Sequence, residues 1–153
     1  VESALLEGGA VHLDDETIEA LRVEAGVPAF GQDMDEETIP LEAGIEQRAI
    51  SFTKGCYVGQ EVIIRVLHRG HGRVARRLVG LLFAGERPDV AGTPLIADGK
   101  DVGSLTSSAR SPALGRGIAL GYVKRDYAEP GTRVSTATGH EVEVVALPFV
   151  PRR

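Results

Sequence analysis

The sequence has 153 residues, enough for one or two small domains, and its 42% hydrophobic and 25% charged residues are typical of an ordinary globular protein. No apolar run approaches the roughly 20 residues of a membrane-spanning helix. A single cysteine excludes an internal disulfide framework and favours a reducing compartment. We therefore expect a cytoplasmic protein, or one of the mitochondrial matrix in a eukaryote. The net charge of -5 is the sum of a strongly acidic first third and a basic middle. The acidic overall balance and the low aromatic content of 5% weigh against a nucleic-acid-binding protein.

The first half of the chain predicts two helices, a loop and a short strand. Asp14 and Asp15 are candidate N-caps for a helix that Gly26 ends. The acidic stretch 29–44 has no clean period and predicts an ordered loop. Residues 49–53 read as a strand, whereas 61–68 fit a buried helix or a strand, with the helix favoured by the Glu61–Arg65 spacing and by Gly70 placed to end it.

The second half predicts short strands separated by turns. The expected strands are Arg76–Phe83, Pro94–Ala97, Val102–Ser107, Ile118–Val123, Arg133–Ala137 and Glu141–Val145. The Asp98-Gly99 pair is a strong signal for a two-residue hairpin turn. Closely spaced strands with glycine and proline between them predict a small barrel or sandwich, so the chain reads as α+β, with an α/β segment over residues 1–72 followed by a small antiparallel β-barrel over residues 73–153.

The basic run from Arg65 to Arg77, which includes His68 and His71, has two interpretations. It can capture an anionic ligand tail or a phosphate-rich partner, or it can pair with the acidic first third and be solvated. Gly70 and Gly72 interrupt any helix that would align the two histidines, so no metal site is expected.

The segment KGCYVGQE, residues 54–61, holds the only thiol of the chain. Cys56 follows Lys54 by two residues and precedes a predicted helix start, and both a cation and a helix N-terminus stabilise a thiolate. Cys56 is therefore either a functional thiol assisted by Lys54 or a small buried side chain. Gln60 and Glu61 either bind a ligand or face water at the start of the helix.

Several segments, in order along the chain, resemble one family. KGCYVGQE resembles the signature of the YgfZ-type folate-binding proteins implicated in iron–sulfur cluster assembly and repair, within the superfamily of the glycine-cleavage T-protein. The segments that resemble the wider superfamily are Arg22–Gly26 (R-x-E-A-G), Pro40–Gly44 (P-x-E-A-G), Gly103–Ser108 with Ser111-Pro112, and residues 118–123, 130–132 and 148–149.

The resemblance implies tetrahydrofolate as the cofactor. It makes residues 1–72 the C-terminal portion of a folate-binding domain and 73–153 a T-protein C-terminal-type barrel. Glu24 would contact the pterin ring, because a carboxylate can accept two N–H bonds from its amino-pyrimidinone edge. Lys54 would be an approximate stand-in for a folate-contacting arginine, and Gln60 and Glu61 would be further cofactor contacts.

The function expected from this resemblance is that of a tetrahydrofolate-binding accessory protein, leaning to a non-enzymatic factor, for iron–sulfur cluster assembly or maintenance. Its partners would be iron–sulfur assembly proteins or clients. The alternative is a folate-dependent aminomethyltransferase acting on a lipoyl-bound intermediate, and KGCYVGQE favours the first because the T-protein branch lacks that motif. Family members are about twice as long. We therefore expect either that the folate site is shared with an N-terminal half of the same protein, or that a second copy covers the exposed surface.

Overall fold

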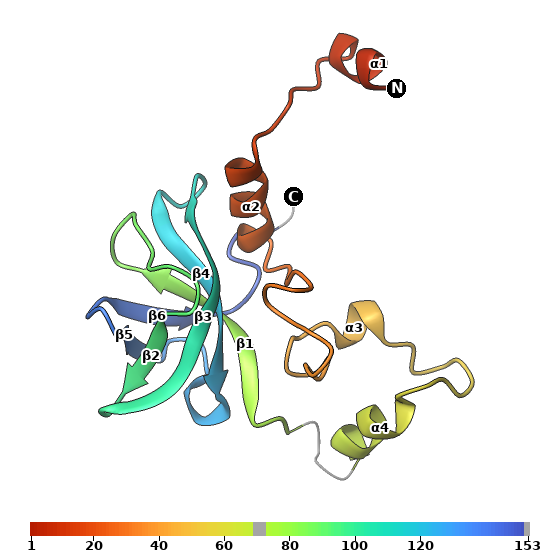
Figure 1. Cartoon of the computed structure of the whole chain (residues 1–153), viewed down its shortest axis with the longest axis vertical. Coiled ribbons are helices and arrows are strands. Elements are labelled where there is room, and N and C mark those ends of the chain that lie inside the picture. Colours follow the sequence, from red (N-terminus) through yellow and green to blue (C-terminus); the bar gives the residue numbers. More distant parts are fainter. Residues whose placement is uncertain (69–72, 152–153) are drawn as a thin grey trace.

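The computed structural model describes residues 1–68 and 73–151, which form a helical segment followed by a β-barrel (Figure 1). The helices are α1 (Glu2–Glu7), α2 (Asp15–Glu24), α3 (Glu46–Ala49) and α4 (Gln60–His68). The strands are β1 (Arg76–Phe83), β2 (Pro94–Ala97), β3 (Lys100–Ser111), β4 (Arg116–Lys124), β5 (Arg133–Thr136) and β6 (Glu141–Val145), with a short 3-10 helix at Arg125–Tyr127 after β4.

The six strands close into a barrel in the order β1-β4-β3-β2-β5-β6, with antiparallel neighbours throughout. The closure is visible at Gly80 of β1, which pairs with Leu120 of β4 on one side and with Val145 of β6 on the other. Closure leaves the sheet without a free edge. The predicted fold class, α+β with a small antiparallel barrel, is confirmed.

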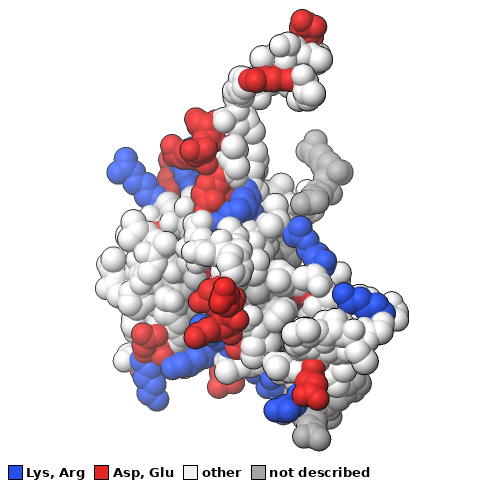
Figure 2. All heavy atoms as spheres, turned by 45° about the vertical axis from the view of Figure 1, so that its right-hand side comes forward, with Lys and Arg blue, Asp and Glu red and all other residues white. Residues whose placement is uncertain are grey.

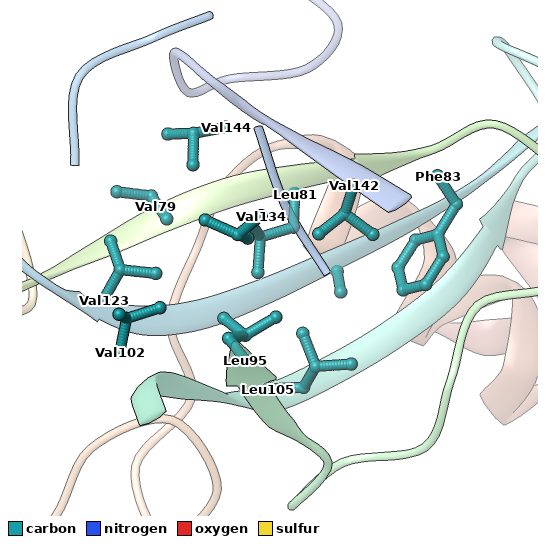
Figure 3. Packing of buried hydrophobic residues seen from close by; sticks show 11 residues of the cluster. Val79, Leu81, Phe83, Leu95, Val102, Leu105, Val123, Val134, Val142 and Val144 are labelled. Carbon is teal, nitrogen blue, oxygen red and sulfur yellow. The ribbon is translucent and has the colours of Figure 1, made fainter. Parts of the chain in front are cut away.

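Alternate side chains of the strands fill the barrel interior (Figure 3). Leu81, Leu95 and Val144 are fully buried there, and Phe83 and Leu105 are 1% exposed. Burying each such side chain stabilises the fold by roughly 1.5–3 kcal/mol. The hairpin between β2 and β3 is the predicted one, because Asp98 (φ 51°) and Gly99 (φ 71°) both adopt the left-handed conformation of a two-residue turn.

Helix α2 lies against the outside of the barrel. Its N-cap is Asp14, whose Oδ1 accepts a hydrogen bond from the amide of Thr17 at 2.7 Å. Val23 is fully buried and packs with Ile118 and Leu120, which belong to the outer face of β4. The helix predicted from Asp14 to Gly26 is therefore confirmed, and its apolar stripe attaches it to the barrel.

The predicted strand at residues 49–53 is wrong. Helix α3 covers Glu46–Ala49, and residues 50–53 belong to no strand. Phe52 is 58% exposed, so this stretch lacks the neighbouring strand and covered face that would make it part of a sheet. Residues 61–68, which fit either a helix or a strand in the sequence, belong to helix α4. Helix α1 was not predicted from the sequence.

Four residues of the basic run, Arg69, Gly70, His71 and Gly72, lie outside the described residues. The predicted helix end at Gly70 and the proposed roles of these basic side chains therefore have no structural counterpart here.

The acidic character of the first third is visible on the surface. Figure 2 shows acidic side chains gathered on the projecting N-terminal arm and on the helix below it, and Asp15 and Glu16 occupy the first turn of α2. Within residues 1–68 and 73–151, none of the helices is both long and apolar enough to span a bilayer.

Candidate functional site

Arg22 is the centre of a polar network where α2 meets the barrel. Its Nη1 donates to Asp33 Oδ2 and to the carbonyl of Val27, both at 2.6 Å. Its Nη2 donates to Ser107 Oγ of β3 and to Glu19 Oε1, again at 2.6 Å. The Arg22 side chain is 16% exposed and that of Asp33 is fully buried, so this is an ion pair shielded from water.

The carboxylate of Asp33 accepts hydrogen bonds on both oxygens. Oδ1 accepts from Ser107 Oγ at 2.6 Å and from Thr106 Oγ1 at 2.5 Å, and Oδ2 accepts from the amide of Ala29 at 2.9 Å as well as from Arg22. A buried carboxylate is stable only when it is paired and hydrogen-bonded in this way. The network therefore ties the loop after α2 to β3.

The charges in this network support one another. The hydrogen bonding of Arg22 to the Glu19 carboxylate, in which Arg22 donates, is the largest cause that raises the pKa of Arg22, and Asp33 raises it further, while burial acts in the opposite direction. The hydrogen bond from Arg22 is likewise the largest cause that lowers the pKa of Glu19. Arg22 and Glu19 are thus held in their ionised forms at neutral pH.

Glu24 lies at a second contact between α2 and the barrel. It is 6% exposed, and its Oε1 accepts hydrogen bonds from Ser111 Oγ and, at 3.1 Å, from the amide of Ala113. Its carbonyl oxygen accepts from the amide of Phe149 at 2.9 Å, which fixes the end of the chain beside the helix. The barrel therefore orients the Glu24 carboxylate through one oxygen, and contact with a pterin through the other stays a prediction.

The KGCYVGQE segment forms an exposed loop that leads into α4. Cys56 is exposed, and the ammonium of Lys54 lies 4.7 Å from the centre of the Tyr57 ring. Gln60 Oε1 accepts from the Tyr57 amide at 3.4 Å, so Gln60 serves the helix start, and Glu61 is exposed beside it. The functional roles expected of Cys56 and Lys54, and the ligand contacts of Gln60 and Glu61, stay predictions.

The structure does not join the predicted site residues into one cluster. Among the described residues, no hydrogen bond or ion pair links Glu24 to the segment of residues 54–61. That segment is held instead by α4, whose Ile63 packs with Leu41 and with Val74 just before β1.

Sequence reasoning missed Asp33 and Glu19. Both lie in the acidic first third, and their only signal was the presence of Arg22 as the sole arginine or lysine among residues 1–46. Because Asp33 is 11 residues from Arg22 and more than 70 from Thr106 and Ser107, no local spacing could identify the network.

Comparisons with known proteins all lead to one group. Residues 76–151 match the family model of the glycine cleavage T-protein C-terminal barrel domain. An aminomethyltransferase of Streptomyces avermitilis is 40% identical over 140 residues, which cover 88% of this chain and 37% of that protein. The mitochondrial aminomethyltransferase of Homo sapiens is 34% identical over 175 residues, covering 99% of this chain and 41% of that protein.

A solved structure agrees with these sequence matches. The glycine cleavage system aminomethyltransferase T from Bartonella henselae superposes with a TM-score of 0.79 at 30% identity, covering 88% of this chain and 38% of that one. The chain therefore spans about two fifths of the length of the relatives it matches.

These matches correct the function preferred from the sequence. An accessory factor for iron–sulfur cluster assembly is the wrong interpretation, because relatives at 34–40% identity over most of the chain are aminomethyltransferases. The preference rested on eight residues, 54–61, in an exposed loop and helix start, whereas the matches extend over 88–99% of the chain.

Proposed function

The chain carries a glycine cleavage T-protein C-terminal barrel domain and belongs to the T-protein superfamily, and on that premise we propose that it forms the C-terminal part of a folate-dependent aminomethyltransferase. The observation that carries the proposal is the 40% identity over 140 residues. A match of that length extends well beyond the barrel of residues 76–151 and includes the helical segment with Glu24.

Within this proposal residues 1–72 are the C-terminal portion of a folate-binding domain, and the barrel of residues 73–153 holds it in place. Tetrahydrofolate would accept the one-carbon unit of an aminomethyl group while ammonia leaves. The role of this chain would be to bind and orient tetrahydrofolate. The Arg22–Asp33 network fixes α2 on β3, and the barrel fixes one oxygen of Glu24, leaving the other for the N–H groups of a pterin edge.

A Glu24→Gln substitution tests this role in the complete polypeptide that carries the chain. The substitution retains an oxygen acceptor for Ser111 and Ala113 but removes the negative charge. We expect tetrahydrofolate binding to weaken by roughly 1.5–3 kcal/mol, the worth of a charge-assisted hydrogen bond. The measurements are calorimetric titration with tetrahydrofolate and folate-dependent release of ammonia from an aminomethyl-bearing carrier.

Glu16→Gln is the matched control, because Glu16 is an exposed residue in the first turn of the same helix. It should leave folate affinity and ammonia release unchanged. If Glu24→Gln binds tetrahydrofolate as tightly as the parent, Glu24 only docks the helix. If the parent itself binds no folate and releases no ammonia, the proposed function fails.

The helical segment exposes apolar side chains that another part of the protein is expected to cover. Ile18 and Leu21 of α2 are 52% and 46% exposed, Val62 and Ile64 of α4 are 52% and 42% exposed, and α1 and α3 bury no residue. We propose that an N-terminal portion of the same polypeptide packs on this segment, as the share of the relatives left unmatched suggests.

Hydrogen exchange distinguishes the two halves of the isolated chain. In dilute solution the amides of α1, α3 and α4 should exchange at least about a hundredfold faster than those of β1, β3 and β4, because few buried contacts oppose their local opening. In the complete polypeptide α4 should become protected. Equal protection of helices and strands in the dilute chain would show that the segment needs no cover, and protection that rises with chain concentration would identify a second copy instead.

A further inference from the structure

A cavity of about 200 Å³ lies between the loop of residues 31–38 and the outer face of the barrel. Arg76 of β1, Ser104 and Thr106 of β3, and Tyr122 of β4 form its barrel side. The cavity has room for roughly six or seven water-sized groups. It therefore suits a small polar molecule.

The hydroxyl of Tyr122 is buried and unpaired. The residue is 6% exposed, and among the described residues its oxygen has no hydrogen-bond partner. The nearby Thr38 hydroxyl is one of the causes that lower the pKa of Tyr122, but it makes no hydrogen bond with the phenol oxygen. It donates instead to Asp35 Oδ1 at 2.8 Å. Burial raises the pKa of Tyr122 to about 12, so the phenol keeps its proton at neutral pH. A buried O–H without an acceptor is unfavourable, and a ligand oxygen would relieve it.

Arg76 places a second donor beside this hydroxyl. Its guanidinium carbon lies 4.6 Å from the centre of the Tyr122 ring, and its Nε donates to Glu42 Oε2 at 2.9 Å. The side chain is 48% exposed, and no hydrogen bond from its Nη groups to a described residue is present. A phenol O–H and guanidinium N–H groups together match the acceptor oxygens of a carboxylate.

The surrounding charges select the rest of the ligand. Among the described residues, Arg76 is paired with Glu42 and the buried Asp33 with Arg22, which leaves Asp35 as the acid on the cavity wall that makes no ion pair, although the hydrogen bond from Thr38 and, to a lesser extent, the charge of Arg76 lower its pKa. Asp35 Oδ1 accepts from the Glu37 amide and the Thr38 hydroxyl, and neither bond uses Oδ2. A simple anion would meet this extra negative charge, whereas a ligand with its own ammonium group would be neutral overall and match both sides.

We propose that this cavity binds a small zwitterionic α-amino acid. Its carboxylate accepts hydrogen bonds from the Tyr122 hydroxyl and the Arg76 guanidinium, and its ammonium group faces Asp35. The site is independent of the proposed folate contact at Glu24, since the two share no residue.

The first test is an NMR titration of the 153-residue chain with alanine, acetate and methylamine as separate probes. Alanine should bind at least tenfold more tightly than acetate or methylamine, and the amide shifts should centre on residues 31–38 and 120–123. Equal affinity for acetate and alanine would overturn the zwitterion assignment, and absence of saturable shifts with alanine would overturn the site.

The second test is Tyr122→Phe, which removes only the unpaired hydroxyl. We expect at least a tenfold loss of alanine affinity, with a Tm that stays equal or rises because a buried polar atom without a partner has gone. Tyr127→Phe is the matched control, since the hydroxyl of Tyr127 is 3.3 Å from Asp98 and lies outside the cavity, so alanine affinity should be unchanged. Unchanged affinity of Tyr122→Phe, or a lowered Tm, would show that the hydroxyl serves the fold and would refute the proposal.

Discussion

Replacing Asp33 by alanine is expected to lower the free energy of unfolding by about 3–5 kcal/mol. The substitution leaves the Arg22 guanidinium, only 16% exposed, without its buried counter-ion. It also removes the acceptor for the Ser107 hydroxyl and one of the two acceptors, beside the Leu120 carbonyl, for the Thr106 hydroxyl. Removing one partner of a buried pair is more harmful than removing both, because the remaining charge stays desolvated.

Urea unfolding followed by circular dichroism measures this effect as a lower midpoint at an unchanged slope. Asp35→Ala is the matched control: it removes an exposed carboxylate two residues further along, which makes no ion pair among the described residues, and it should cost less than about 1 kcal/mol. A double substitution that also replaces Arg22 should be less harmful than the sum of the single ones. A cost below about 1 kcal/mol for Asp33→Ala would mean that the network contributes little to stability.

The barrel could be predicted from the sequence because its signals are local. The bounds of β1, β2 and β6 agree with the expected ones, since alternating apolar residues and turn residues between them carry the information. Strand β3 is longer than predicted at both ends, and a register shift between Leu105 and Ser107 interrupts its alternation against β4. Such an irregularity depends on the neighbouring strand, which a single segment cannot reveal.

The helical segment and the site depended on contacts between distant residues. Residues 49–53 have the composition of a strand, but no partner strand is available to them, so tertiary context decided against the local signal. The motif containing Arg22 and the one containing Thr106 and Ser107 were identified separately, and the structure shows that they meet at Asp33. Neither their contact nor the importance of Asp33 could be inferred from spacing along the chain.

Gly103→Ala is expected to be the most harmful glycine substitution in the barrel. A Cβ on Gly103 would lie 1.9 Å from the carbonyl oxygen of Tyr122 and 2.9 Å from Val123 Cα, both backbone atoms of the adjacent β4. Gly103 and Val123 are directly paired, so the clash can be relieved only by moving two hydrogen-bonded strands apart. We expect a loss of about 3 kcal/mol or more, at the upper end of what overpacking costs, or a chain that does not fold.

Gly85→Ala is the control for this substitution, because a Cβ there meets nothing within 4 Å and Gly85 needs no positive φ. It should leave the unfolding midpoint nearly unchanged or raise it slightly, since alanine restricts the unfolded chain more than glycine does. Thermal unfolding of both variants and of the parent measures the difference. A Gly103→Ala variant with the Tm of the parent would show that β3 and β4 can separate locally at little cost, and that close approach of the two strands is not what requires glycine at this position.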